Sequence, residues 1–304
     1  MVYHNKQRIN LKQILTNELK DKTVLITGGG GSVGSELTKK ILEYPVRTVR
    51  VLDIDEHALF RLKRRLNDKR LRLLLGSILD KDRIQMAGND ADIIFHTAAI
   101  KNIEISEFNP IETVDINING TINLIKMSMM NKPKKFINIS TDKAVQPSTL
   151  YGTTKQMGEL LTSWAGEHLN DITKFASIRL GNIIESRGNV FEIWEEEHKM
   201  NKPLSITHPE MERYFFHMDE VMEFILRCLP HVERGEIFVP KMTTYKIKDL
   251  AYKISNRHKT IGPRQGEKLE ETLISEKEKK LSQETSKMWI IKPYLNDNQT
   301  PKKR

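Results

Sequence analysis

The chain has 304 residues, of which 38% are apolar, and no uninterrupted apolar stretch approaches the length of about 18 residues that a membrane-spanning helix needs. Cys228 is its only cysteine, which excludes an internal disulfide or a cysteine-rich metal site and predicts a protein of the reducing cytoplasm. The formal charge of +9 suggests anionic partners, but no basic patch with interleaved aromatic residues indicates nucleic acid, and the nine histidines show no metal-ligand spacing.

Residues 1–21 are predicted to form an amphipathic helical arm. Their apolar residues recur near helical spacing, at Ile9, Leu11, Ile14, Leu15 and Leu19. This spacing indicates a helix that packs on the main body of the protein or on another subunit, rather than one that takes part in chemistry.

A strand, a glycine-rich turn and a helix follow the arm. Glycine allows a tight turn and a close approach of the backbone to a pyrophosphate, whose charge is stabilised by the free amides of the next helix. The glycines fit Thr-Gly-x-x-Gly-x-x-Gly from Gly28 and Gly-x-Gly-x-x-Gly from Gly29, and the sequence leaves this register open. The residues predicted to bind the dinucleotide at this turn are Gly28, Gly31, Ser32, Val33 and Gly34.

Asp53 ends the next apolar run, 48–52, at the distance expected for the acidic residue of a dinucleotide site. A carboxylate there accepts hydrogen bonds from the adenosine ribose and repels a 2′-phosphate, which favours NAD over NADP. The arginines at 61, 64 and 65 lie nearby, so this preference is modest and the cofactor is predicted to be NAD or NADP.

Four further apolar runs, at 70–75, 91–99, 135–140 and 175–182, are separated by helical segments. Strands that alternate with helices at this interval predict a parallel, doubly wound α/β sheet, which we assign to residues 22–182. Ala98 and Ala99 end the second of these runs, and their small side chains would let a dinucleotide lie against the backbone.

Tyr151 and Lys155 are spaced by four residues in a segment with helical character, so they are predicted to lie on one helix face. An ammonium about 4 Å from a phenol is expected to lower the phenol pKa enough for Tyr151 to act as a base near neutrality. The spacing by itself is also typical of a solvated helix face.

Beyond residue 182 the regular alternation of strands and helices loosens. Residues 183–290 are predicted to form mainly a small substrate-binding lobe, with some chain returning to the sheet, and 291–304 to form a basic tail. Arginines on loops beyond the carboxyl ends of the strands are suited to bidentate binding of a second anion, such as another diphosphate, or to plain solvation.

From residue 22 to about 274 the chain resembles the extended short-chain dehydrogenase/reductases and, among them, the UDP-N-acetylglucosamine 4,6-dehydratases of polysaccharide biosynthesis. The resemblance rests on Thr27-Gly-Gly-Gly-Gly-Ser-Val-Gly-Ser-Glu-Leu37, His96-Thr-Ala-Ala-Ile-Lys101, Ser140-Thr-Asp-Lys143, Tyr151-Gly-Thr-Thr-Lys155, Arg179-Leu-Gly-Asn182, Ser186-Arg-Gly188, His208 to Phe215, and Gly266-Glu-Lys268. It implies a Rossmann fold with a small C-terminal lobe, and a homo-oligomer.

The resemblance also implies a lyase that dehydrates a UDP-N-acetylhexosamine to the UDP-4-keto-6-deoxy sugar with NAD or NADP. Tyr151, assisted by Lys155, would take the proton of the C4 hydroxyl group, and Thr141 would hold that hydroxyl. Lys143 would remove the C5 proton, and Asp142 would protonate the departing C6 hydroxyl. The lysine beside the aspartate suggests inversion at C5.

Further positions are assigned through the same resemblance. Ser77 and Ile78 match the loop at the adenine, although serine stands where aspartate is usual, and Asn117 matches the helix asparagine that supports the active-site lysine. The residues expected at the UDP-sugar are Lys101, Asn182, Arg187, Arg213, Arg264 and Glu267.

Two other functions fit part of the pattern. A nucleotide-sugar C4-epimerase would use Tyr151 and Lys155 but would not need the Asp142–Lys143 pair. A non-catalytic dinucleotide-sensing module would keep the glycine turn and need neither Tyr151 nor Lys155.

Overall fold

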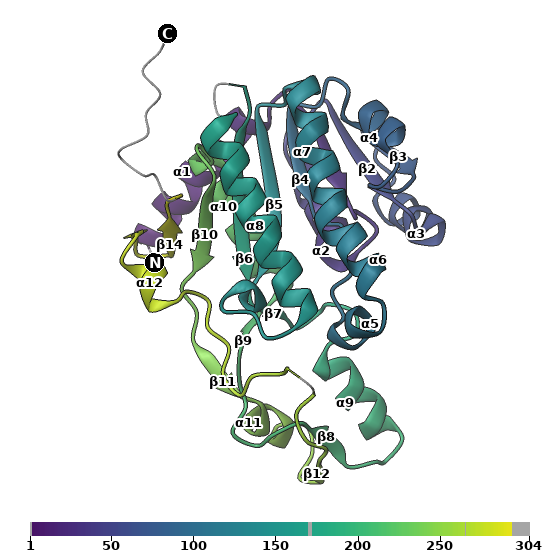
Figure 1. Ribbon diagram of the computed structural model, residues 1–304, viewed down its shortest axis with the longest axis vertical. Helices are drawn as coiled ribbons and strands as arrows, with labels where there is room; N and C mark the ends of the chain where they lie inside the picture. The colour runs from purple at the N-terminus through teal and green to yellow at the C-terminus, as the bar shows by residue number, and fades with distance from the viewer. Residues whose placement is uncertain (1, 170–171, 265, 294–304) are drawn as a thin grey trace.

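The computed structural model describes residues 2–169, 172–264 and 266–293, and in this part of the chain a nine-stranded sheet forms the centre of the molecule (Figure 1). The strand order is β13-β14-β10-β6-β5-β4-β1-β2-β3. All neighbours from β10 to β3 pair parallel, whereas β14 is antiparallel to both β10 and β13. The strands are β1 (Thr23–Thr27), β2 (Thr48–Asp53), β3 (Leu71–Leu75), β4 (Ile93–His96), β5 (Lys135–Thr141), β6 (Lys174–Leu180), β10 (Glu236–Pro240), β13 (Ser282–Glu284) and β14 (Met288–Ile291).

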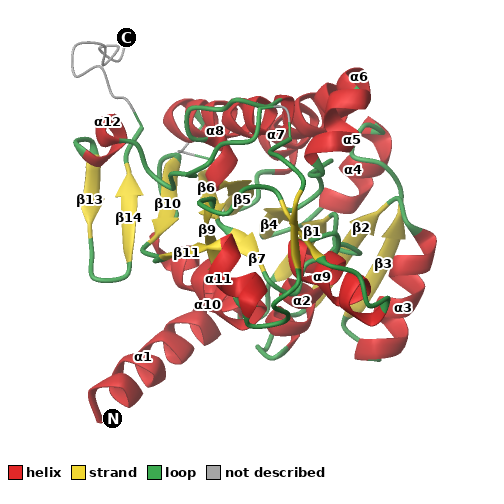
Figure 2. Ribbon diagram, turned by 90° about the horizontal axis from the view of Figure 1, so that it is seen from below, coloured by secondary structure: helices red, strands yellow, loops and turns green. Residues whose placement is uncertain are grey.

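Helices cover both faces of the sheet (Figure 2). One face carries α2 (Ser32–Leu42), α3 (Glu56–Leu66) and α10 (Met218–Cys228), and the other carries α4 (Lys81–Gly88), α7 (Gly120–Asn131) and α8 (Leu150–His168). Successive strand residues supply the two cores in turn: Val24 and Ile26 pack into the first, and Leu25 packs into the second. The predicted doubly wound α/β sheet is therefore confirmed.

The N-terminal helix α1 (Val2–Leu19) packs its last turns against the first of these cores. Leu15 and Leu19 are buried there, and the side chain of Ile14 is exposed. The Nζ atom of Lys135 lies 2.8 Å from the Glu18 carboxylate and fixes the helix to the start of β5. The side chain of Ile9 lies outside the described part of the structure.

A second, smaller unit lies beyond the carboxyl ends of the parallel strands (Figure 1). It contains the sheet β11-β9-β7, the strand pair β12-β8, and two helices around a core that includes Trp194 and Met211. The elements are β7 (Asn182–Ile183), α9 (Val190–Lys199), β8 (Leu204–Ile206), β9 (Glu212–Phe216), β11 (Thr244–Lys246), α11 (Ile247–Tyr252) and β12 (His258–Thr260).

Several segments of the C-terminal half return to the large sheet. Between β9 and β11 the chain forms α10 and β10, and after β12 it forms α12 (Glu276–Lys279), β13 and β14. Of the predicted tail 291–304, Ile291 ends β14, and residues 294–304 lie outside the described part. Within the described ranges, every helix is too short or too polar to cross a bilayer.

Candidate active site

The glycine turn joins β1 to α2 at the carboxyl end of the sheet. Gly28 has a positive φ of 69°, and a Cβ atom there would come within 2.5 Å of the Ala98 backbone, so only glycine fits. A Cβ at Gly34 would come as close to the carbonyl oxygen of Gly28. The turn therefore leaves a cradle in front of the first amides of α2, which is the arrangement that binds a pyrophosphate.

The Asp53 carboxylate lies at the end of β2, beside this turn. Its oxygens accept hydrogen bonds from the amide of Gly30 (2.8 Å) and from the amide of Asp55 (3.0 Å). These two bonds fix the carboxylate at the edge of the cavity, where an adenosine ribose of a dinucleotide would lie.

Tyr151 and Lys155 lie on α8, beside the end of β5. Thr149 caps the helix, since its side-chain oxygen accepts a hydrogen bond from the amide of Gly152 at 3.1 Å, so Tyr151 falls in the first turn. The Lys155 ammonium donates a hydrogen bond of 2.6 Å to the carbonyl of Ile139. Both side chains are buried.

The expected lowering of the Tyr151 pKa is wrong for the protein by itself. Burial raises the pKa of the phenol, and the negative charge of Asp142 raises it further, whereas the hydrogen bond with Thr141 opposes both. Burial also lowers the pKa of the Lys155 ammonium to about 8. The helical spacing was correct, but desolvation outweighs the attraction that the spacing suggested.

Asp142 and Lys143 form the short helix η2 (Asp142–Ala144) directly after β5. The Asp142 side chain is fully buried, and its Oδ1 atom accepts hydrogen bonds from the Thr141 hydroxyl (2.8 Å) and from the Lys143 ammonium (3.0 Å). Lys143 also donates to the side-chain oxygen of Asn182 at 3.4 Å. The pair therefore connects the end of β5 with β7 of the small unit.

A cavity of about 550 Å³ runs from the glycine turn to these residues. Most residues predicted from the sequence line it: Gly28, Gly31, Ser32, Val33, Gly34, Asp53, Ser77, Ile78, Ala98, Ala99, Lys101, Thr141, Lys143, Tyr151, Lys155, Asn182 and Arg187. Asp142 lies behind this wall and reaches it through Thr141 and Lys143.

Asn117 also lies behind the cavity wall. Its amide nitrogen donates to the Ile100 carbonyl and to the Thr154 hydroxyl, both at 2.9 Å, and its amide oxygen accepts from the Ile100 amide. The residue connects the loop after β4 with α8, which carries Lys155, and so supports the lysine through the helix rather than by a direct hydrogen bond.

Three residues expected at the UDP-sugar cluster with one another in the small unit. The Arg213 guanidinium is buried and lies 3.3 Å from the Glu267 carboxylate, and it also donates to the carbonyls of Lys268 and Leu269. Glu267 accepts a hydrogen bond from the amide of Arg264 at 3.0 Å. In this arrangement the donors of Arg213 hold the chain around 267–269 together.

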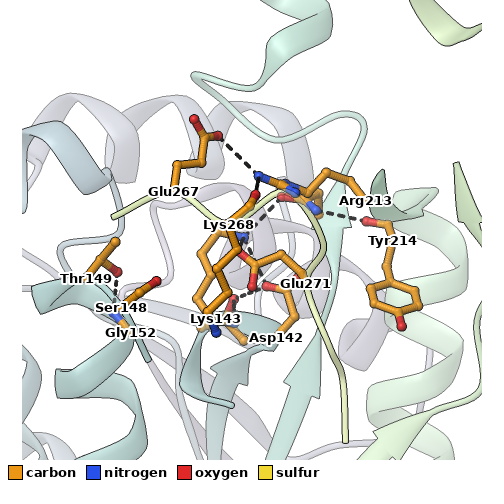
Figure 3. A network of polar contacts seen from close by, with 12 residues as sticks. Asp142, Lys143, Ser148, Thr149, Gly152, Arg213, Tyr214, Glu267, Lys268 and Glu271 are labelled. Atoms are coloured by element: carbon orange, nitrogen blue, oxygen red, sulfur yellow. Dashed lines mark hydrogen bonds and ion pairs between the residues drawn. The ribbon is translucent and has the colours of Figure 1, made fainter. Parts of the chain in front are cut away.

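The sequence reasoning missed Glu271, which lies beside Lys143 (Figure 3). Its carboxylate is buried, and its Oε1 atom lies 3.9 Å from the Lys143 ammonium. Burial raises the pKa of Glu271, the Lys143 charge opposes this, and the Asp142 charge adds to it. The only available signal was a glutamate in an irregular segment that follows Gly266-Glu-Lys268, and such glutamates are usually solvated.

The doubly wound sheet, the glycine turn and the Tyr151–Lys155 pair beside one cavity define an extended short-chain dehydrogenase/reductase. A model of the polysaccharide biosynthesis protein family matches residues 24–293, and the chain belongs to this family.

Relatives and a solved structure agree with this assignment. An uncharacterized membrane protein of Methanocaldococcus jannaschii is 40% identical, covering 93% of this chain and 89% of its own. A UDP-N-acetylglucosamine 4,6-dehydratase (inverting) of Campylobacter jejuni is 36% identical over 90% of this chain and 84% of its own, and a UDP-glucose 4-epimerase of Rickettsia bellii is 34% identical over 85% and 79%. The X-ray structure of Pen from Bacillus thuringiensis matches with a TM-score of 0.88 and 32% identity, covering 91% and 90%.

Proposed function

We propose that the protein is an NAD(P)-dependent 4,6-dehydratase of a UDP-N-acetylhexosamine, with UDP-N-acetylglucosamine as the first candidate. The observation that carries the proposal is the Asp142–Lys143 ion pair, at 3.0 Å, at the same end of the cavity as Thr141 and Tyr151. An epimerase exchanges hydride at C4 alone and has no use for a second acid–base pair. A dehydratase also has to remove a proton from C5 and protonate a leaving hydroxyl.

The residues at the cavity fit a nicotinamide dinucleotide. The cradle at Gly28 and Gly34 suits the pyrophosphate, and the Asp53 carboxylate suits an unphosphorylated ribose, which favours NAD. When bound, the cofactor would supply a positive charge and a hydride acceptor for C4 in its oxidised form and, once reduced, a hydride donor for C6.

The protein residues handle the protons. Beside the positive charges of Lys155 and of the bound cofactor, which oppose the effect of burial, the ionised Tyr151 phenol would accept the proton of the C4 hydroxyl as that carbon becomes a ketone, and Thr141 would hold the oxygen. The ketone acidifies the C5 hydrogen. Once the proton of the ion pair has moved from Lys143 to Asp142, the neutral Lys143 amine accepts the C5 proton and Asp142 gives its proton to the C6 hydroxyl, which leaves as water. A proton returned to C5, together with the hydride that the reduced cofactor would supply to C6, completes the UDP-4-keto-6-deoxy sugar, so the net change is the loss of one water.

The nucleotide end of the substrate would meet the small unit. Lys101, Asn182 and Arg187 line the cavity and would hold the UDP. Arg213 would join them only after exchanging some of its side-chain bonds to the segment around Glu267, whereas the exposed Arg264 guanidinium would leave only a 4.0 Å contact with the Glu267 carboxylate.

Mass spectrometry tests the proposal. The purified protein is incubated with UDP-N-acetylglucosamine and either NAD or NADP; we expect a product lighter by one water. A product of unchanged mass with a different configuration at C4 would instead identify an epimerase. This is the second candidate function, because a UDP-glucose 4-epimerase is among the relatives. Deuterium uptake and NMR of the product would give the configuration at C5.

The assignment of Tyr151 needs its own variant. Tyr151→Phe keeps the ring and removes the phenol oxygen, so we expect turnover to fall by about 10²-fold or more. Tyr245→Phe is the matched control, because Tyr245 is exposed on β11 and lies outside the residues that line the cavity. Full turnover by Tyr151→Phe would refute the catalytic assignment.

A further inference from the structure

The Lys143 ammonium is surrounded by oxygen atoms from three separate segments. Asp142 Oδ1 lies at 3.0 Å, Asn182 Oδ1 at 3.4 Å and Glu271 Oε1 at 3.9 Å. Lys143 lines the cavity, whereas Asp142 and Glu271 do not. The two carboxylates therefore contact the ammonium from outside the residues that line the cavity, and Asn182 contacts it from among them.

Glu271 is buried, so its carboxylate requires a partner when it is ionised. It is 7% exposed, and its Oε2 atom accepts no hydrogen bond from any described residue. A buried carboxylate is costly unless a cation or a donor compensates it. Among the described residues, Lys143 is the cation whose nitrogen lies within 4.0 Å of this carboxylate.

The other cations near Glu271 have partners of their own. Arg213 pairs with Glu267 and with backbone carbonyls. The Lys268 ammonium donates to the carbonyls of Val145 (2.9 Å) and Gln146 (2.6 Å). Lys143 is therefore the nearest cation to Glu271, and Arg213 and Lys268 contribute smaller electrostatic effects.

The segment 266–271, here called the strap, fixes the position of Glu271. The Ser148 hydroxyl donates to the carbonyl of Gly266 at 2.6 Å, and Lys268 bonds the same loop that leads into α8. A Cβ at Gly266 would come within 2.5 Å of the Ser148 carbonyl oxygen, so the two segments lie in close contact. On its other side, the strap accepts hydrogen bonds from Arg213 (Figure 3).

We propose that Glu271 is a positioning residue that, with Asp142, holds the Lys143 ammonium at the sugar end of the cavity. The strap thereby couples the small unit to the group that accepts the C5 proton. The inference rests on the proposed function for the role of Lys143, but the contact itself can be tested whatever the reaction is.

The first test measures the contact without turnover. Reductive methylation of lysines with formaldehyde and a borohydride reagent, followed by peptide mass mapping, gives the reaction rate of each ammonium group. An ion pair stabilises the protonated, unreactive form, so Glu271→Gln is expected to speed methylation of Lys143 by about tenfold. Lys101 is the internal reference, because it lines the same cavity and bonds the Arg187 carbonyl.

The second test measures the reaction. Glu271→Gln increases the fraction of free Lys143 amine but removes one of the two carboxylates that hold it in position. We expect the loss of position to outweigh the gain in free amine, so kcat should fall by about tenfold, and KM should stay unchanged because Glu271 does not line the cavity. Glu270→Gln is the matched control, because Glu270 is the adjacent residue on the strap and is exposed. We expect the control to match the natural protein in both tests.

The outcomes separate the two hypotheses. An unchanged methylation rate of Lys143 in Glu271→Gln would overturn the inference. A decrease in kcat, an increase in KM by the same factor and a lower melting temperature would also overturn it, because together they indicate a purely structural role. If the natural protein forms no dehydrated sugar, the proposed function fails, and the methylation rate alone still decides the position of Lys143.

Discussion

Two buried charge clusters connect the sheet with the C-terminal half of the chain, and each contains one cation and two carboxylates. In the first, Arg179 on β6 makes a two-pronged contact with Glu159 on α8 (2.9 and 2.8 Å) and a third bond of 2.6 Å to Glu278 on α12. Its remaining terminal nitrogen donates to the Leu273 carbonyl. Although burial opposes it, the pKa of Arg179 is raised by Glu159 and Glu278, so this cation never loses its charge.

The second cluster contains Asp142, Lys143 and Glu271, and it is less completely bonded. Lys143 makes one short contact, to Asp142, and a longer one of 3.9 Å to Glu271. One oxygen of each carboxylate is buried without a hydrogen bond from the described residues. The first cluster is saturated and joins elements, whereas the second faces a cavity and keeps capacity to bind or move a proton.

Replacing Lys143, the cation of the second cluster, should have the largest effect on turnover. Lys143→Met keeps the length of the side chain and removes its only proton-accepting group, so we expect kcat for dehydration to fall by about 10²- to 10⁴-fold. The product is measured by mass spectrometry and the stability by urea unfolding. Full dehydration activity in Lys143→Met would contradict a role of the second cluster in proton transfer.

Replacing Arg179, the cation of the first cluster, should instead destabilise the folded protein. Arg179→Met leaves Glu159 without its buried partner, and the expected loss is about 3–5 kcal/mol of unfolding free energy. Lys199→Met is the control, because its pair with Glu195 is exposed and such pairs contribute about 0–1 kcal/mol. Equal losses in these two variants would contradict the structural role of Arg179.

Lys155 differs from both of these buried cations, because its hydrogen bond among the described residues goes to a backbone carbonyl and not to a carboxylate. Its folded pKa of about 8 lies below the ordinary value of 10.5, so the unfolded chain binds more protons between these values. Stability from this group therefore rises by up to about 3 kcal/mol as the pH increases through that window, and it is lost again as the pH falls through 8.

The measurement compares unfolding free energies of the natural protein and Lys155→Met from pH 7 to 10.5. The difference between the two curves isolates Lys155 from other groups that titrate there. We expect the variant to lack the rise, and parallel curves would show that burial does not control this ammonium.

The smallest effect is expected at Asp53, a carboxylate held by backbone amides instead of a cation. Asp53→Asn keeps the shape and removes the charge that would repel a 2′-phosphate. The affinity for NADP relative to that for NAD should therefore increase by about tenfold or less. Isothermal titration calorimetry with each dinucleotide gives this ratio. A ratio that does not change would remove Asp53 from cofactor selection.

Much of the site could be predicted because it lies at the ends of regular elements. Gly28 follows β1 and Asp53 ends β2 in the same parallel sheet, so their approach to one another is dictated by the fold class. The contribution of the small unit was harder to predict. Arg213 carries the charge expected at a diphosphate, but its position among carbonyls of the strap depends on the irregular path of the chain between β12 and α12.

The amino-acid sequence by itself determined the alternation of strands and helices, the dinucleotide turn, and the common helix face of Tyr151 and Lys155, because these depend on local periodicity and on the backbone freedom of glycine. Only the tertiary structure decided that Glu271 lies against Lys143 and that burial raises the Tyr151 pKa. Both depend on which distant segments exclude water from a side chain, and desolvation is a property of the folded surroundings that no local spacing records.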